Sequence, residues 1–311
     1  MKVLVLLSSY NGSLYIKEQI MSLVIQKDID LDIYVRDDGS TDNTIKIVSS
    51  IKDSYPNITL FADTNVGFVS SFTKLVHKAY LSSHYDYYAF CDQDDIWYDN
   101  KLSVAVKYLK EASKNEPVMF CSNSRLIDSE GNPKGGSFVK NNCIINKNNI
   151  YLYSRVQGCS MVFNRKALEL FHNHPPINCF HDRWISLICA TFGEIIYLNE
   201  PLFSYRIHSS NTLGMPELKY KGFWELQSSR IKYWLTSSRT KRSRRFEEII
   251  SFYESFCGKN LSYNTTLPLA YKASKSTFYR LLLALDTKLL PERFSAYSFT
   301  KHFVHVILNR L

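Results

Sequence analysis

Four largely apolar runs alternate with segments of helical periodicity over the first 91 residues of this 311-residue chain. The runs are Val3–Leu7, Leu31–Val35, Ile58–Ala62 and Tyr87–Cys91. Strands buried on both faces of a parallel sheet have this composition, because neither face meets water. Between the first two runs, Ile16, Ile20 and Leu23 recur at helical spacing. This order predicts an α/β fold with a mostly parallel sheet, right-handed crossovers and flanking helices.

Similar signals continue to about residue 208. Helical periodicity and short apolar runs predict further helices and strands at Lys101–Ala112, Val118–Ser122, Gly158–Phe163, Arg165–Phe171, Asp182–Thr191, Ile195–Leu198 and Leu202–His208. A Gly-containing turn between Ser124 and Ser137 predicts a hairpin. The strand and helix pattern therefore predicts a single large α/β unit.

An acidic turn follows the fourth apolar run directly. Asp92, Asp94 and Asp95 place three carboxylates within four positions, and such groups repel one another unless a cation holds them. Carboxylate oxygens are preferred ligands of Mg²⁺ and Mn²⁺. The turn therefore predicts a divalent metal site. The alternative is a solvated acidic loop that caps the helix beginning near Asp99.

Two earlier turns, Ser8–Gly12 and Arg36–Asn43, also follow predicted strands. The carboxyl ends of parallel strands meet at one edge of a sheet, where such folds bind ligands. A nucleotide suits these side chains, because Tyr10 can stack on a base and Asp38 can accept a hydrogen bond from a base N–H. A metal at Asp92 would then offset the charge of a diphosphate. The alternative for Asp38 is turn and cap chemistry for the next helix.

Two further polar residues lie downstream. Asp182 opens a predicted helix and is either its N-cap or a general base for an acceptor hydroxyl. His208 ends an extended segment and is either a metal or phosphate contact or an ordinary surface histidine. The residues alone leave both alternatives open.

Taken together, eight short segments resemble the inverting family 2 glycosyltransferases of GT-A fold, and most closely their bacterial rhamnosyltransferase-like branch. In chain order they are Leu7–Gly12, Gln19–Gln26, Val35–Asp42, Asn65–Phe68, Cys91–Trp97, Gln157–Met161, His181–Asp182 and Arg206–Asn211. They cover roughly residues 1–212. The resemblance implies a GT-A domain and a sugar-transfer reaction that inverts the anomeric carbon in one displacement.

The resemblance also implies roles for residues at the nucleotide. Ser8, Tyr10 and Asp38 would hold the base and ribose. Asp92 and Asp94 would form the Asp-x-Asp element, with Asp94 as the direct ligand of Mn²⁺ or Mg²⁺ and Asp92 close to both nucleotide and metal. His208 would approach the diphosphate or the metal.

Further implied roles concern the sugars. Asp182 would be the catalytic base, whereas Gly158, Trp97 and His181 would lie beside the donor or acceptor sugar. The family's Glu-Asp pair is His181-Asp182 here, so any role of the preceding acid is inapplicable. The Asp-Gln-Asp-Asp-Ile-Trp segment is typical of enzymes that use dTDP-L-rhamnose. A UDP-hexose donor, carrying glucose or galactose, is the alternative, because no residue distinguishes uracil from thymine.

The last third of the chain differs in composition. Residues 217–311 hold 17 of the 38 lysines and arginines but only 7 of the 29 acidic residues. We therefore expect a GT-A domain at residues 1–215 and a basic, aromatic-rich helical region at residues 216–311. One interpretation is an anionic membrane surface, which suits a glycan acceptor carried on a polyprenyl diphosphate in surface polysaccharide assembly. The alternatives are a packed appendage and, least favoured, nucleic-acid binding without catalysis.

Cellular location follows from three observations. No run reaches the roughly 18 apolar residues of a membrane-spanning helix. Met1–Leu7 meets Ser-Ser-Tyr-Asn-Gly rather than a small-residue cleavage site, so we expect an internal strand and no signal peptide. Seven cysteines without a Cys-x-x-Cys pair indicate reduced thiols. These features predict a cytoplasmic protein that is peripheral at the inner face of the cell membrane.

Overall fold

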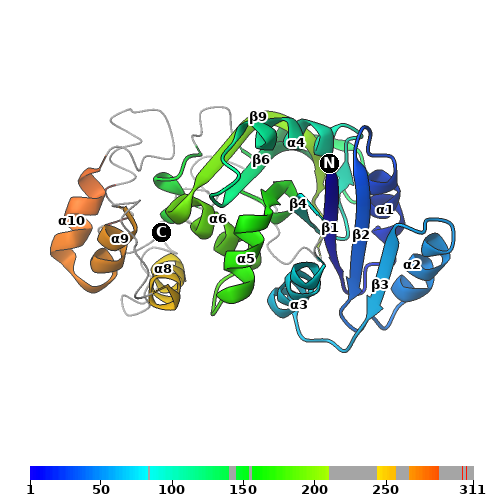
Figure 1. The fold of residues 1–311 in the computed structure, drawn as a ribbon, viewed down its shortest axis with the longest axis horizontal. Coiled ribbons are helices and arrows are strands. Elements are labelled where there is room, and N and C mark those ends of the chain that lie inside the picture. Colours follow the sequence, from blue (N-terminus) through cyan, green and yellow to red (C-terminus); the bar gives the residue numbers. More distant parts are fainter. Residues whose placement is uncertain are drawn as a thin grey trace, which may run out of the picture.

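A computed structural model of the chain describes residues 1–82, 85–139, 145–153, 156–209, 244–256 and 266–286, together with Phe303 and Val306. The described strands form one curled sheet flanked by helices (Figure 1). The strand order is β3-β2-β1-β4-β8-β6-β9-β5, and β7 pairs with β6 beside this path. The predicted fold class, a mostly parallel α/β sheet with flanking helices, is confirmed.

The first half of the chain follows the predicted β-α alternation. Its elements are β1 (Lys2–Ser9), α1 (Ile16–Val24), β2 (Asp30–Asp37), α2 (Thr44–Lys52), β3 (Ile58–Ala62), α3 (Phe68–Leu81) and β4 (Tyr87–Cys91). All pairs among these four strands are parallel. The register places Leu7 of β1 opposite both Val35 of β2 and Cys91 of β4. Three strands therefore end at the same level, and their following turns lie at one edge.

Each face of the central strands is buried by different helices. Leu4 and Leu6 point into a core formed with helices α3, α5 and α6, whereas Val3, Val5 and Leu7 point into a core formed with α1, α2 and α4. Alternate side chains of a strand lie on opposite faces, so a strand covered on both sides needs an unbroken apolar run. This explains why β1 contains no polar residue between Val3 and Leu7.

The second half of the chain adds antiparallel pairs to the sheet. Its elements are β5 (Ile96–Trp97), α4 (Lys101–Glu111), β6 (Val118–Ile127), β7 (Pro133–Ser137), β8 (Met161–Asn164), α5 (Arg165–Asn173), α6 (His181–Phe192) and β9 (Glu194–Arg206). Strand β8 runs antiparallel to β4 and β6, whereas β6 and β9 are parallel. Two details differ from the prediction. Gly158–Ser160 form a 3₁₀ turn before β8, and the two expected segments after Ile195 are one strand with register shifts opposite β6.

Three described helices follow residue 243: α8 (Arg244–Ser255), α9 (Thr266–Lys275) and α10 (Thr277–Leu285). Helix α8 lies beside α6, and α10 lies at the far end of the molecule from β3 (Figure 1). The rings of Phe252 and Trp184 meet edge to face at 5.0 Å, and α8 shares the core of α6. The described helices thus pack on the main core, as the appendage interpretation expected. The division at residues 215 and 216 stays a prediction.

The most basic and aromatic part of the C-terminal region, from Phe223 to Arg242, lies outside the described residues. Its membrane role therefore remains a prediction. Among the helices that the structure describes, none has the length and apolar run needed to cross a lipid bilayer.

Candidate active site

A large cleft, of about 1430 Å³, opens at the sheet edge where β1, β2 and β4 end. The start of α6, the segment after β9 and helix α8 complete its wall. Nine of the ten site residues predicted from the sequence line this cleft: Ser8, Tyr10, Asp38, Asp92, Asp94, Gly158, His181, Asp182 and His208.

Trp97 does not line the cleft. Its side chain is 1% exposed and packs in the core, with the Lys101 ammonium 3.0 Å from its ring centroid. Its backbone N–H donates a hydrogen bond to Ser22 Oγ at 3.0 Å. A side chain buried in the core cannot contact a sugar in the cleft, so the prediction that Trp97 does so is wrong. The ring instead anchors the acidic turn to the core, which is the ordinary use of a large apolar side chain directly after a polar turn.

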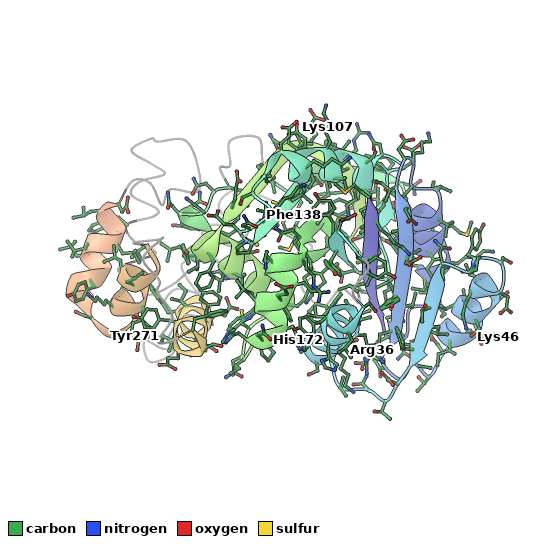
Figure 2. The ribbon with its side chains drawn as sticks, viewed as in Figure 1. Arg36, Lys46, Lys107, Phe138, His172 and Tyr271 are labelled. Carbon is green, nitrogen blue, oxygen red and sulfur yellow. The ribbon has the colours of Figure 1, made fainter. Side chains whose placement is uncertain are left out.

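Asp38 is held by a buried arginine that the sequence did not single out. Arg36 lies at the end of β2, on the side of α3 (Figure 2). Its guanidinium donates to Asp38 Oδ1 at 2.6 Å and to Ser71 Oγ at 2.8 Å. The Asp38 carboxylate also accepts hydrogen bonds of 2.9 Å from the backbone N–H groups of Val66 and Gly67. These hydrogen bonds fix the turn before α3, whereas the alternative interpretation had placed Asp38 in the turn and cap of the next helix, α2. Asp38 still borders the cleft.

The turn after β1 is clamped to the acidic turn. Gln93 Oε1 accepts a hydrogen bond from the Tyr10 backbone N–H at 2.8 Å, and Gln93 Nε2 donates to the Tyr10 carbonyl at 3.1 Å. A Cβ added at Gly12 would lie 2.2 Å from Gln93 Oε1, so the clamp requires glycine there. The Tyr10 side chain remains 47% exposed at the cleft, which Ser8 also lines.

The acidic turn meets the end of β9 at the predicted metal residues. His208 Nε2 lies 2.9 Å from Asp94 Oδ2, and both side chains border the cleft. These two residues are 114 positions apart in the chain, so only the fold joins them. A carboxylate and an imidazole are donors that Mn²⁺ accepts. The pairing predicted between Asp94 and His208 is thus geometrically possible.

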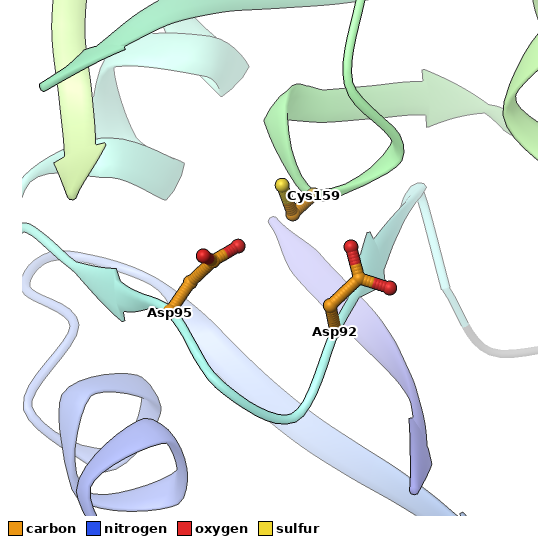
Figure 3. Close-up of side chains that lie close together, drawn as sticks. All are labelled: Asp92, Asp95 and Cys159. Atoms are coloured by element: carbon orange, nitrogen blue, oxygen red, sulfur yellow. The ribbon is translucent and has the colours of Figure 1, made fainter. Parts of the chain in front are cut away.

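Asp92 and Asp95 lie next to Cys159 in the same region (Figure 3). One ligand atom from each of the three lies within 4.8 Å of the others. Burial, followed by the charge of Asp94, raises the pKa of both carboxyl groups. Burial also raises the pKa of the Cys159 thiol, which donates a hydrogen bond to Asp95. Asp95 Oδ2 has no partner among the described residues. Crowded, protonation-prone carboxylates of this kind fit a hard divalent cation.

Arg206 organises this turn and had no role assigned from the sequence. It is 1% exposed, and its Nε donates to the Asp94 carbonyl at 2.8 Å. Its backbone N–H donates to Asp95 Oδ1 at 3.1 Å, and its Nη2 pairs with Glu18 at 2.5 Å. The sequence did offer a signal, because Arg206 stands two positions before His208. Both belong to Arg206–Asn211, one of the eight segments that resemble family 2 glycosyltransferases. The target of Arg206 could not be named without the fold.

Asp182 lies in the first turn of α6 and faces the cleft. The N-cap position belongs to Phe180, so Asp182 is not the N-cap. Its Oδ1 accepts a hydrogen bond of 2.6 Å from the Arg183 backbone N–H. Burial, with a contribution from the charge of Glu248, raises its pKa to about 6 against the lowering effect of that hydrogen bond. A carboxylate tuned in this direction suits a general base near neutral pH.

His181 is a buried imidazole that borders the cleft. It is 2% exposed, and its ring stacks on Phe72 at a centroid distance of 3.7 Å. Burial lowers its pKa to about 3, so the ring is neutral. Neither ring nitrogen has a partner among the described residues. A Cβ at Gly158 would lie 2.9 Å from His181 Nε2 and 3.3 Å from Asp182 Cβ, so glycine is needed for this close approach.

Helix α8 adds a residue that sequence reasoning missed altogether. Glu248 is 5% exposed, lines the cleft and forms an ion pair with Arg183, with 3.3 Å between Oε2 and Nε. It belongs to the basic C-terminal region, which was expected to contribute a surface rather than part of the site. No local pattern around Glu248 distinguishes it from its exposed neighbour Glu247.

A curled, mostly parallel sheet that gathers polar turns and an Asp-x-Asp element at one edge defines a nucleotide-sugar transferase of the GT-A class. Solved structures agree with this assignment. The described fold is similar to S. aureus TarS in complex with UDP-GlcNAc, with a TM-score of 0.57 and 16% identity over 99% of this chain and 82% of that one. It is also similar to the mannosyltransferase PcManGT of Pyrobaculum calidifontis in complex with GDP-Man and Mn²⁺, with a TM-score of 0.51 and 16% identity over 99% and 85% of the two chains.

Sequence comparison places the chain in a family. Residues 4–171 match Glycosyl transferase family 2, which is more than half of the chain. The chain is 28% identical over 297 residues to the dTDP-rhamnosyl transferase RfbG of Shigella flexneri, covering 90% of this chain and 99% of the relative. It is also 27% identical over 220 residues to an uncharacterized glycosyltransferase of Nostoc, covering 68% of this chain and 66% of the relative. The chain belongs to glycosyl transferase family 2 and is a glycosyltransferase enzyme.

Proposed function

We propose that this enzyme transfers L-rhamnose from dTDP-L-rhamnose to a glycan acceptor, with inversion at the anomeric carbon. The single observation that carries the reaction type is one cleft that holds both the Asp94–His208 pair and Asp182. The choice of donor is supported by the similarity to RfbG along nearly the whole length of both chains. The donor preference is the part that an experiment must decide.

The residues around the acidic turn fit a divalent cation. Asp94 and His208, with Asp92 nearby, would hold Mn²⁺ or Mg²⁺, and the same turn contains Asp95 Oδ2, which has no hydrogen bond among the described residues. When bound, such an ion offsets charge on the departing nucleoside diphosphate. Ser8, Tyr10 and Asp38 would hold the base and ribose at the ends of β1 and β2.

Asp182 would act as the base in a single displacement. Its carboxylate takes the proton of an acceptor hydroxyl while that oxygen forms a bond to the anomeric carbon. The bond from this carbon to the diphosphate oxygen breaks on the opposite face, and the electron pair leaves with dTDP. With a pKa near 6, Asp182 is ionised at neutral pH yet basic enough to accept the proton. One displacement inverts the configuration.

The neutral wall of the cleft would contact the sugars. His181 offers a ring nitrogen with no partner among the described residues, in a site lined by Phe68 and Phe180. Buried polar atoms are normally hydrogen-bonded, so an open imidazole nitrogen here suits a sugar hydroxyl. Because Gly158 has no side chain, the imidazole can lie directly against its backbone. The aromatic rings suit the apolar face and methyl group of a deoxysugar.

We also propose that the acceptor glycan is carried on a polyprenyl diphosphate and that the enzyme works as a cytoplasmic protein at the inner face of the membrane. The excess of basic residues in the C-terminal region supports this, because basic side chains attract anionic headgroups. Helix α10 adds Leu281, Leu282 and Leu285, which are 40%, 41% and 52% exposed. Pelleting with anionic vesicles at low salt, but not at high salt, tests this proposal.

The donor is tested by calorimetric binding of dTDP-L-rhamnose, UDP-glucose and UDP-galactose, each with and without Mn²⁺. We expect metal-dependent binding of dTDP-L-rhamnose, and the Asp94→Ala variant should lose it. If the enzyme prefers UDP-glucose or UDP-galactose, the transferred sugar is that hexose rather than rhamnose, and the proposed type of reaction still holds. The stereochemistry can be followed by proton NMR with a β-linked donor. A product that retains the β configuration would refute the single displacement.

A further inference from the structure

Helix α8 brings a buried carboxylate from the C-terminal region to the catalytic end of the cleft. Glu248 and Arg183 form an ion pair at 3.3 Å, and their side chains are only 6% and 2% exposed. Both residues line the cleft together with Asp182. The residue that pairs with Glu248 is therefore the immediate neighbour of the proposed base.

Arg183 is the junction of three separate segments. Its Nη1 and Nη2 donate to the backbone carbonyls of Ile150 and Tyr151, in the short 3₁₀ helix at Asn149–Tyr151. Its Nε faces Glu248 of α8, and its backbone N–H donates to Asp182 Oδ1 at 2.6 Å. The first turn of α6 has no side-chain cap. The Asp182 carboxylate is therefore bonded to the backbone of a residue whose guanidinium joins α6 to α8 and to the 3₁₀ helix.

We propose that Glu248 is a positioning residue for sugar transfer. By holding Arg183, it sets the orientation of Asp182, and its negative charge helps to keep Asp182 basic. This inference rests on the proposed role of Asp182 as the base. It also makes the C-terminal region part of the active site rather than only a surface for partners.

A purely structural role for the ion pair is the competing explanation. Helix α8 is already attached by apolar packing, with Phe252 against Trp184 at 5.0 Å, and by the Ser251 hydroxyl, which donates to the Ile177 carbonyl at 2.6 Å. Buried ion pairs often add little stability over well-packed apolar residues. A charged pair at this position is thus better explained by what it does to Asp182 than by the attachment of α8.

The electrostatic surroundings of Asp182 define what removal of Glu248 would do. On its own helix, Arg183 lowers its pKa and His181 is neutral. From α8, the charge of Glu248 raises its pKa, and Asp92 at the end of β4 interacts with it electrostatically. Neutralising Glu248 leaves Arg183 unbalanced. The pKa of Asp182 should then fall, and its strength as a base should fall with it.

The test compares Glu248→Gln and Glu248→Ala with the controls Glu247→Gln and Glu247→Ala, since Glu247 is exposed on the same helix. We expect Glu248→Ala to lower kcat by about 10²-fold, as misplacement of a catalytic group by roughly 1 Å can do. Donor KM and donor affinity by calorimetry should stay unchanged, which also shows that the variants fold. Glu248→Gln keeps the volume, so it should lose less kcat and shift the acidic limb of the pH profile to lower pH. Wild-type kcat in both Glu248 variants, or equal losses in the Glu247 controls, would overturn the inference.

A readout without turnover separates this inference from the proposed function. The carboxyl ¹³C resonance of Asp182, assigned by its loss in Asp182→Asn, should titrate at a lower pH in Glu248→Gln than in the wild type. An unchanged titration overturns the inference even when sugar is transferred. Absence of transfer by the wild type with every donor would refute the proposed function, and the titration would still decide the inference.

Discussion

The two ends of the cleft are built in different ways. At the nucleotide end, polar side chains from adjacent turns bind one another and the backbone. Asp38 is an example, because its carboxylate accepts hydrogen bonds from the Arg36 guanidinium and from the backbone N–H groups of Val66 and Gly67. At the other end, the Asp182 carboxylate accepts a hydrogen bond from the backbone of its own helix, and burial raises its pKa to about 6. Many hydrogen bonds stabilise a charged carboxylate, whereas desolvation leaves it reactive.

This contrast suggests that the nucleotide end is a rigid frame and that the catalytic end holds the less stable, more reactive group. The nucleotide end uses residues close to strand ends: Ser40 bonds to Asp37 within the turn after β2, and Ser9 at the end of β1 donates to the same carboxylate. The catalytic end combines α6, the Gly158 turn and α8. Substitutions at the two ends should therefore have separable effects on binding and on turnover.

The largest effect is expected from Asp182→Asn at the catalytic end. The amide cannot accept a proton, so kcat should fall by about 10³- to 10⁴-fold, within the range contributed by general base catalysis. Donor binding by calorimetry should remain, because the nucleotide end is untouched. Asp53→Asn, on the exposed end of α2, is the matched control and should behave as wild type. Full turnover by Asp182→Asn would show that another group is the base.

Asp94→Ala should affect binding and turnover together. Loss of several kcal/mol of charge stabilisation corresponds to about 10³-fold in turnover. The donor should also lose its metal dependence in calorimetry, which separates this variant from Asp182→Asn. Asp99→Ala serves as control, since that carboxylate pairs with Lys27 near the molecular surface. Mn²⁺-dependent donor binding that survives in Asp94→Ala would mean that the ion is held elsewhere.

Gly158→Ala should produce an intermediate effect confined to the catalytic end. The new methyl group would lie 2.9 Å from His181 Nε2, so the imidazole or the start of α6 must shift. A displacement below 1 Å should lower kcat by about tenfold, less than the loss expected for a full ångström. Donor affinity should hold, and the melting temperature should fall only slightly. If donor affinity falls and kcat does not, Gly158 belongs to the nucleotide end.

The smallest effect concerns pH. The proposed base, Asp182, can accept a proton only when it is ionised, so kcat should be constant well above pH 6 and fall about tenfold per pH unit below it. The raised pKa also makes the stability of the fold depend on pH. Above about pH 6, Asp182 is ionised in the folded protein, and its burial then lowers the free energy of unfolding by the largest amount. This destabilisation disappears as the pH falls towards 3.8, the ordinary pKa of an aspartate. Asp182→Asn should therefore melt higher than wild type at pH 8, by a margin that shrinks towards pH 4.

Much of the fold could be predicted because its signals are local. The unbroken run Val3–Leu7 can only be buried on both faces, and it became the central strand β1. Tyr87–Cys91 is likewise an apolar run that became a central strand, β4, so the acidic turn that follows it lies at the predicted edge of the sheet. Trp97 is a residue for which a local signal was not sufficient. It belongs to a recognised motif, but the motif does not reveal whether its side chain points into the cleft or into the core.

Contacts between distant segments could not be predicted. Arg206 reaches the acidic turn from 112 positions away, and Glu248 reaches Arg183 from a region that composition marked as a basic surface. Both are single charged residues with no periodic pattern around them. Their partners are chosen by the order of strands beyond β4 and by the packing of α8 on α6.

The sequence by itself determined the class of fold, the polar turns at the strand ends and the identity of nine residues in the cleft, because hydrophobic periodicity and turn chemistry act over a few neighbouring residues. Only the tertiary structure decided which charges are buried together. It set the pKa of Asp182, left the His181 imidazole neutral and brought Glu248 into the same cleft as Asp182. The physical reason is that desolvation and Coulomb energy depend on distances in space, which the order of residues does not state.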